Sequence, residues 1–178
     1  LELPDQHPIN NLARRPNEKR ELFPLKINFC RDCSHSQQMV SVDPEYLFSN
    51  YLYVSGTSKT LDQDFEDLAQ LIFEKTWGNV KNAKLSVLDV AGNDGSFLEK
   101  FKKYGCKTCC VDPAENLFEA CQAREIDLAI CDFFPTDCLG ELKFDVITAL
   151  NVVAHVPDPL SFLQEFAKRL NPNGKAFI

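Results

Sequence analysis

The sequence has no long apolar run, no basic cluster and few glycines. Its 178 residues contain no apolar stretch near the roughly 20 residues that a helix needs to span a bilayer, so no membrane association is expected. The formal net charge of -7 disfavours nucleic acid as a partner. The nearest basic residues, Arg14-Arg15 and Lys19-Arg20, are interrupted by Pro16 and Glu18, which favours a solvated loop over a binding patch. No secretory signal is recognisable, so the cytoplasm is the expected location.

Cysteine, in contrast, is abundant, with eight residues in the chain. Because no secretion signal is present, we expect reduced thiols rather than a disulfide framework. Cys30 and Cys33 stand apart because their Cys-x-x-Cys spacing is typical of metal ligands. The others include five that lie in or beside apolar segments, where a free thiol behaves as a small buried hydrophobe: Cys106, Cys109, Cys110, Cys121 and Cys131.

The chain divides into two parts by pattern. Residues 1–58 are rich in proline, asparagine and aromatic side chains, and their weak periodicity predicts an irregular segment. In residues 59–178, strand and helix patterns alternate, after a first helix that Thr60 or Asp62 can cap. The predicted helices are 61–77, 95–104, 114–124 and 160–170, and the predicted strands are 85–90, 107–111, 128–131, 144–150 and 175–178.

This alternation predicts an α/β fold, a Rossmann-like parallel sheet with helices on both faces. An open sheet of this kind binds ligands at the carboxyl ends of its strands. The residues that directly follow each strand are therefore the candidate functional residues.

The first strand ends in Asp89 and leads into a turn of small residues, Ala91, Gly92, Asn93 and Asp94, before a helix opens at Gly95. Such a turn places the first N–H groups of a helix beside a ligand. The glycine spacing does not match the dinucleotide pattern Gly-x-Gly-x-x-Gly. A carboxylate at the strand end suits a ligand that carries positive charge, such as S-adenosylmethionine. An ordinary strand–helix turn is the alternative.

Acidic residues also follow the second and third strands. Asp112 follows the second, near the interval of about 20 residues at which an acid reaches a ribose, and two carboxylate oxygens suit a cis-diol. A helix cap is the alternative. Asp132 and Phe133 follow the third strand, where a carboxylate can accept from an adenine amino group and a ring can cover the base. Adjacent phenylalanines are equally typical of a core.

The fourth strand is followed by Asn151 and His155. A histidine at this edge is a candidate general base because its pKa lies near neutrality. Asn151 is a candidate to bind the methionine end of the cofactor or the substrate. A purely structural histidine is the alternative.

Three segments together resemble class I S-adenosylmethionine-dependent methyltransferases: residues 87–95, residues 111–116 and residues 151–158. The turn with Asn93-Asp94-Gly95 is similar to the sugar C-methyltransferase branch, which acts on nucleotide-linked keto-deoxysugars. Ala91 replaces the usual first glycine, a sterically mild change. The cofactor-binding set that follows is Asp89, Ala91, Gly92, Asn93, Gly95, Asp112, Asp132, Phe133 and Asn151.

That branch carries an N-terminal zinc-binding domain, and residues 23–33 resemble the approach to its second cysteine pair. Because zinc takes four ligands, Cys30 and Cys33 supply half a site, and His35 is a candidate third ligand. Two ordinary thiols are the alternative. Residues 51–58 resemble the Tyr- and Ser-rich linker into the cofactor site.

The resemblance also implies a boundary between a zinc-domain remnant with its linker, residues 1–58, and a methyltransferase domain truncated at its C-terminus, residues 59–178. We expect a piece of a longer protein, inactive by itself, that holds zinc only when intact.

The implied reaction is C-methylation of a nucleotide-linked keto-sugar through an enolate, with His155 as base or enolate-stabilising group and Tyr53 as an orienting residue. The alternatives are an O- or N-methyltransferase for a small molecule, a nicotinamide-dependent oxidoreductase, which the broken glycine pattern disfavours, and a non-catalytic cofactor-binding scaffold.

Overall fold

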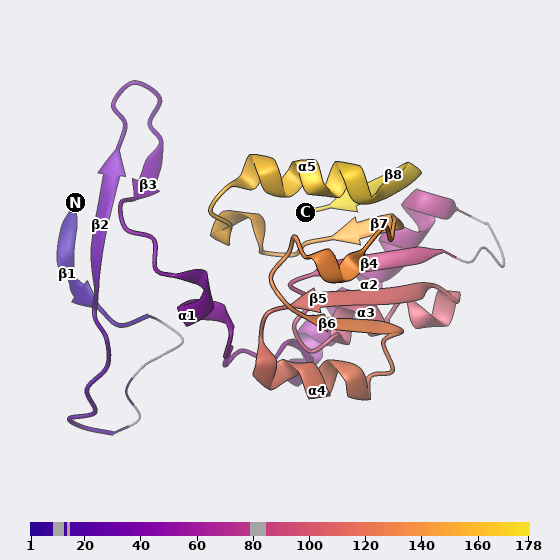
Figure 1. The fold of residues 1–178 in the computed structure, drawn as a ribbon, viewed down its shortest axis with the longest axis horizontal. Helices are drawn as coiled ribbons and strands as arrows, with labels where there is room; N and C mark the ends of the chain where they lie inside the picture. The colour runs from indigo at the N-terminus through magenta and orange to yellow at the C-terminus, as the bar shows by residue number, and fades with distance from the viewer. Residues whose placement is uncertain (9–12, 14, 79–84) are drawn as a thin grey trace. The chain divides into compact units, whose positions relative to one another are not determined.

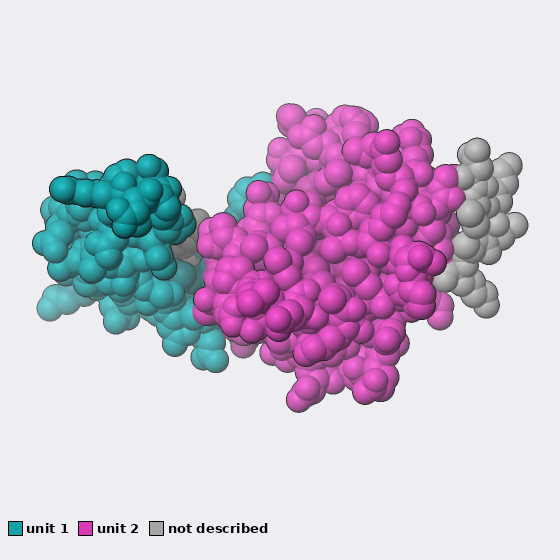
Figure 2. All heavy atoms as spheres, turned by 90° about the horizontal axis from the view of Figure 1, so that it is seen from above, with its two compact units in different colours: residues 1–53 teal, residues 54–178 magenta. Residues whose placement is uncertain are grey.

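The computed structural model describes residues 1–8, 13, 15–78 and 85–178. It divides into two compact units, Leu1–Tyr53 and Val54–Ile178, which Figure 2 colours separately. Each unit is described by itself below. Across the described ranges, no helix combines the length and the apolar character needed to cross a membrane.

The first unit contains a small antiparallel sheet where the sequence predicted an irregular segment, and that prediction was wrong. Its strands are β1 (Glu2–Gln6), β2 (Phe23–Phe29) and β3 (Ser36–Gln38), in the order β1-β2-β3, and helix α1 (Pro44–Phe48) follows them. The prolines that exclude a helix here do not exclude a strand at a sheet edge. Phe23, Leu25 and Ile27 alternate with other residues along β2, which is the period of a strand.

The second unit is built on a parallel sheet, as predicted. Its strands are β4 (Ser86–Val90), β5 (Lys107–Asp112), β6 (Leu128–Cys131), β7 (Phe144–Thr148) and β8 (Leu170–Phe177). All four neighbouring pairs are parallel, and the order is β6-β5-β4-β7-β8 (Figure 1). The chain adds β5 and β6 on one side of β4 and then returns to add β7 and β8 on the other. This reversal creates a switch point at the carboxyl edge of β4 and β7, where open α/β sheets bind ligands.

The helices of this unit are α2 (Lys59–Trp77), α3 (Ser96–Glu99), α4 (Glu115–Ala123) and α5 (Pro159–Arg169). Ser58, rather than the predicted Thr60 or Asp62, caps α2, since its side chain accepts from the backbone N–H of Leu61. The short 3-10 helices are η1 (Ser55–Thr57), η2 (Lys102–Tyr104), η3 (Asp137–Leu139) and η4 (Val153–His155).

The predicted continuous helix over residues 95–104 was wrong. It is broken into α3 and η2, because the N–H groups of Lys100, Phe101 and Tyr104 each donate to the carbonyl three residues earlier rather than four. Gly105 then ends η2 with a left-handed φ of 74°.

Helices cover both faces of the parallel sheet. On one face, Ala69 and Ile72 of α2 and Phe97 of α3 pack with Val87 of β4 and Cys110 of β5. On the other, Phe162 and Phe166 of α5 pack with strand residues that include Leu88, Cys109 and Ile147. The three central strands, β4, β5 and β7, are therefore buried over most of their length.

Candidate functional site

The turn after β4 has an unusual backbone. Ala91 and Asn93 adopt left-handed conformations with φ of 55° each, and Gly95, which precedes α3, has φ of 75°. A left-handed conformation costs a non-glycine residue roughly 1–2 kcal/mol. The replacement of glycine by Ala91 is therefore less mild than the sequence suggested. The turn is closed by two backbone hydrogen bonds, from Ala91 N to Val111 O at 2.7 Å and from Gly95 N to Gly92 O at 2.9 Å.

Gly92 lies directly above the core at this turn. A Cβ on Gly92 would come 2.7 Å from Cys110 Sγ and 3.0 Å from Asp89 Oδ2. Both distances are shorter than ordinary van der Waals contact, so a side chain at this position would displace the turn from the sheet. Gly92 is required here by packing.

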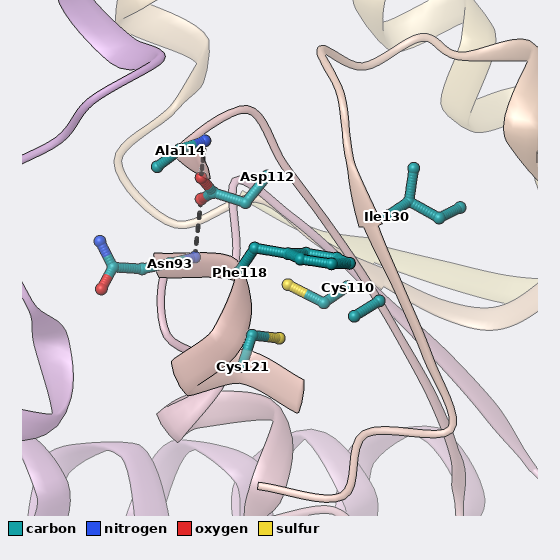
Figure 3. A pocket seen from close by; sticks show the side chains of 8 residues that line it. Asn93, Cys110, Asp112, Ala114, Phe118, Cys121 and Ile130 are labelled. Carbon is teal, nitrogen blue, oxygen red and sulfur yellow. Dashed lines mark hydrogen bonds between the residues drawn. The ribbon is translucent and has the colours of Figure 1, made fainter. Parts of the chain in front are cut away.

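Asp112 connects the turn to the neighbouring strand. Its Oδ2 accepts from the backbone N–H of Asn93 at 2.7 Å, and its Oδ1 accepts from that of Ala114 at 2.8 Å (Figure 3). Burial raises the pKa of Asp112, although these two hydrogen bonds oppose the shift. Each carboxylate oxygen has a second lone pair, so Asp112 keeps the capacity to accept from the hydroxyls of a ligand.

A small hollow lies beside Asp112, between α4 and strands β5 and β6. In Figure 3, Phe118 and the thiols of Cys110 and Cys121 line its floor, whereas the amide of Asn93 points away from it. The lining is mostly apolar, which accounts for the dehydrated surroundings of Asp112.

Asp89, the acid at the end of β4, lies in the core rather than at the surface of the edge. It is 4% exposed, and its Oδ1 accepts from Thr148 Oγ1 of β7 at 2.6 Å. Burial raises the pKa of Asp89 to about 7; the hydrogen bond from Thr148 lowers it and the charge of Asp112 adds to the rise. The Asp89 carboxyl group therefore gains and loses its proton near neutral pH.

Asp132 and Phe133 follow β6 at the same edge, and both are half-buried. The Asp132 carboxylate accepts from the N–H of Phe133 at 2.8 Å and from Thr136 Oγ1 at 2.5 Å. Phe134, in contrast, belongs to the core, because its ring packs edge-on against Phe162 and Phe166 with centroid distances of 5.4 and 5.3 Å. Of the two adjacent phenylalanines, Phe133 thus lies at the edge and Phe134 packs in the core.

The segment after β7 carries Asn151 and His155, both exposed. Asn151 has a left-handed φ of 59°, and the N–H of His155 donates to Val152 O at 2.8 Å within η4. These residues follow the strand on the far side of the switch point from Asp112. Tyr53, 50% exposed, is the last residue of the first unit, and its predicted orienting role stays a prediction.

Asp94, Arg124 and Thr148 contribute to this edge through side-chain contacts that the sequence did not predict. Asp94 Oδ2 accepts from Arg124 Nη2 at 2.8 Å, and Arg124 lies at the end of α4. The sequence predicted Thr148 only as part of the strand 144–150. Their partners are 30 and 59 residues away in sequence, and no local pattern indicates such pairs.

The predicted metal ligands lie in the turn between β2 and β3. Cys30 N donates to His35 O at 2.8 Å, Ser34 N donates to Cys30 O at 2.9 Å, and both cysteines are exposed. Across the described part of the chain, no group of three or more His, Cys, Asp or Glu side chains is placed to hold a metal ion, so His35 does not complete a site. The donor set present does not fit a four-ligand zinc site.

Comparison with known proteins gives the family. Residues 59–178 match the model of a methyltransferase domain. The C-methyltransferase NovU of Streptomyces niveus is 26% identical over 166 residues, which cover 88% of this chain and 38% of that protein. The ubiquinone biosynthesis O-methyltransferase of Xanthomonas oryzae pv. oryzae is 26% identical over 98 residues, which cover 52% of this chain and 41% of that protein. The chain thus spans less than half the length of these relatives.

Among solved structures, the plantazolicin methyltransferase BpumL, in complex with a monoazolic desmethylPZN analog and SAH, aligns with a TM-score of 0.53 at 18% identity. The alignment covers 64% of this chain and 45% of that one, and it shows a shared fold. The family-model match over residues 59–178 spans about two thirds of the chain and assigns the family. The chain belongs to the methyltransferase-domain family.

Proposed function

We propose that this chain binds S-adenosylmethionine at the carboxyl edge of its parallel sheet and serves as a methyltransferase. The observation that carries the proposal is the link between Asp112 and the turn, in which the carboxylate holds Asn93 N at 2.7 Å and remains at the edge of β5. Family membership and the SAH bound to the structural relative BpumL support the same cofactor.

The donor set at this edge fits that cofactor. Asp112 would accept from the ribose hydroxyls, and Asp132 with Phe133 would contact the adenine. Asp89 lies beneath the turn, where its charge would favour the cationic end of the cofactor. Ala91, Gly92, Asn93 and Gly95 would shape the turn, and Asn151 would bind the methionine end from the opposite side of the switch point.

At the finer level we propose C-methylation of a nucleotide-linked keto-deoxysugar. The support is the match to NovU, a C-methyltransferase, over 88% of this chain. S-adenosylmethionine, when bound, supplies an electrophilic methyl group. His155 would remove the proton from the carbon next to the sugar ketone, and the resulting enolate carbon is the nucleophile. A positioned general base contributes about 10²–10⁴-fold to such a step.

O-methylation of a small molecule is the second candidate. It is favoured by the match to a ubiquinone biosynthesis O-methyltransferase over 98 residues. In that reaction, the same His155 would deprotonate a hydroxyl group rather than a carbon acid. The cofactor site would be the same, so only the acceptor distinguishes the two.

Calorimetric titration of the chain with S-adenosylhomocysteine and, separately, with NAD tests the cofactor. We expect saturable binding of the former alone, and no heat with it would overturn the proposal. Transfer of a labelled methyl group by the intact protein, and by its His155→Ala variant, is then assayed with nucleotide-linked keto-sugars and with phenolic acceptors. His155→Ala should abolish transfer while leaving the affinity for S-adenosylhomocysteine unchanged. Unchanged turnover would remove His155 from the mechanism.

Cys30 and Cys33 are a separate proposal, as half of a zinc site whose other ligands come from outside the described residues. Because two cysteines alone do not make a four-ligand site, the test uses the intact protein, whose zinc content is measured by mass spectrometry after dialysis. Stoichiometric zinc that is lost in Cys33→Ser supports the assignment, and equal content in the variant contradicts it.

A further inference from the structure

Asp94 is a buried carboxylate at the centre of a hydrogen-bond cluster behind the turn. It is 2% exposed, its Oδ1 accepts from Ser96 N at 3.3 Å, and its Oδ2 accepts from Arg124 Nη2 at 2.8 Å. Arg124 also donates through Nη1 to Glu99 Oε2 at 2.7 Å. Burial by itself would raise the pKa of Asp94, but the hydrogen bonds from Ser96 and Arg124 lower it below its usual range. Asp94 therefore stays charged and depends on Arg124 for its counter-charge.

The residues just before α2 rest on this cluster. We call Val54, Ser55, Gly56 and Thr57 the strap. Two successive main-chain N–H groups of the strap donate to two successive side chains of the turn, Ser55 N to Asn93 Oδ1 at 2.9 Å and Gly56 N to Asp94 Oδ2 at 3.2 Å. The strap is thus attached to the turn by its backbone.

Only a residue without a side chain fits at position 56. A Cβ would come 2.4 Å from Asp94 Oδ2 and 2.3 Å from Arg124 Nη2. The guanidinium and the carboxylate therefore form one surface, and the strap packs directly against both. Movement of Arg124 would change the surface on which Gly56 rests.

Asn93 is the residue that this arrangement holds. Its backbone is left-handed, its N–H donates to Asp112 at 2.7 Å, and its side chain accepts from Ser55 at 2.9 Å. A non-glycine residue keeps such a conformation only when its surroundings determine it. The chain of contacts runs from Arg124 through Asp94 to the strap, and from the strap to Asn93.

We propose that Arg124 is a positioning residue for cofactor binding, which acts through Asp94 and the strap to hold Asn93 in the conformation that shapes the turn. This inference rests on the proposed function, because it places the cofactor at the turn. Arg124 is separated from the turn by 30 residues and reaches it from the end of α4.

The test compares Arg124→Gln with a matched control, Arg169→Gln. Arg169 also ends a helix, pairs with a carboxylate through Nε to Glu165 Oε1 at 2.9 Å, and donates to the backbone carbonyl of Gly140 at 3.0 Å. Calorimetry with S-adenosylhomocysteine gives the affinity, and thermal melting gives the stability. We expect both variants to lose stability, because each loses charge-assisted hydrogen bonds. Only Arg124→Gln should lose affinity, by about tenfold or more, because only Arg124 contacts Asp94 behind the turn. Arg124→Lys, which keeps the charge beside Asp94, should recover part of the affinity.

Gly56→Ala tests the strap without substituting Arg124 or Asp94, because its Cβ would push the strap away from both. It is the deciding variant if Arg124→Gln does not fold. We expect a similar loss of affinity, together with faster amide hydrogen exchange at Ser55 and residue 56 in both variants. An affinity of Arg124→Gln for S-adenosylhomocysteine within twofold of the parent chain would overturn the role of Arg124 but not the proposed function. If Arg124→Gln is unfolded, the same result in Gly56→Ala would overturn it. Equal loss in Arg169→Gln would also overturn it. No binding by the parent chain would instead overturn the proposed function on which it rests.

Discussion

Thr148 and Asp89 form a buried side-chain pair between two neighbouring strands at the switch point of the sheet. Thr148 Oγ1, which is fully buried, donates to Asp89 Oδ1 at 2.6 Å and also lies 3.3 Å from Leu88 O. The pair connects β7 to β4 directly beneath Gly92. An ionisable group in this position makes the stability of the domain, and the electrostatics of the turn, dependent on pH.

The first prediction concerns the stability contribution of Asp89. Burial raises its pKa to about 7 in the folded protein, against about 3.9 for an unfolded aspartate. Between these values the folded state binds the proton that the unfolded state has lost, so the free energy of unfolding falls as pH rises. The slope from Asp89 is about 1.4 kcal/mol per pH unit within this window.

Asp89→Asn removes this titration, so its stability relative to the parent chain should increase from pH 4.5 to pH 7.5. Urea unfolding of both proteins at several pH values measures the difference. A difference that does not change with pH would show that Asp89 titrates normally.

The second prediction concerns Thr148. Thr148→Val keeps the shape of the side chain but leaves Asp89 without its donor, and loss of a partner by a buried polar group costs about 1–3 kcal/mol. Thr148→Ser retains the hydroxyl and should lose less stability than the valine variant. Chemical denaturation near pH 7 measures both variants. Equal stability of the valine variant and the parent chain would mean that the hydrogen bond makes no net contribution.

The arrangement of the second unit could be predicted from sequence because its signals are local. Apolar strands such as 128–131 alternate with helical patterns, and these determine the parallel sheet without any long-range information. The acids that end strands, Asp89 and Asp112, could be placed at the carboxyl edge for the same reason. The surroundings of these acids could not be predicted, because the hydrogen-bond donor to Asp89 lies on β7, 59 residues away in sequence.

Other features depend on contacts that no local pattern carries. The pairing of Arg124 with Asp94 arises only when α4 packs beside the turn, and the strap attaches to the turn across 38 residues of sequence. In the first unit, the proline-rich pattern predicted an irregular segment, although Pro4 and Pro24 both lie within strands that pair with each other. Proline excludes a helix interior far more strictly than it excludes a strand edge.

The third prediction compares two neighbouring positions in the turn. Gly92→Ala should destabilise the domain by about 1–3 kcal/mol, since its Cβ would overlap Cys110 and Asp89. Ala91→Gly should leave the domain as stable or stabilise it by up to about 1 kcal/mol, because glycine accepts the left-handed φ of 55° without strain. Thermal melting of the two variants measures the change in stability, which should be a loss for Gly92→Ala and no loss or a gain for Ala91→Gly. Destabilisation by Ala91→Gly would contradict the backbone conformation of the turn.

The fourth prediction concerns thiol reactivity. Cys30, Cys33, Cys131 and Cys138 are exposed, whereas the other four cysteines are buried and none of the eight is in a disulfide. Burial raises the pKa of Cys106 to about 11 and that of Cys109 to about 12, which further suppresses the reactive thiolate. Brief treatment with N-ethylmaleimide should therefore modify four cysteines in the native protein and eight in urea. Mass spectrometry of intact protein and of peptides identifies them, and early labelling of Cys109 would contradict its burial.

The last prediction uses one of these thiols to locate the cofactor. Cys131 ends β6 and pairs in register with Asp112 of β5, so it lies at the same edge as the proposed ribose contact. Cys138 is also exposed, but it lies in η3, several residues after the end of β6, and it serves as the internal control. If the cofactor lies between Asp112 and Asp132, saturating S-adenosylhomocysteine should slow N-ethylmaleimide labelling of Cys131 several-fold and leave the rate at Cys138 unchanged. Equal slowing at both sites would indicate general stabilisation rather than coverage, and no slowing at Cys131 under saturating ligand would place the adenosyl group away from β6.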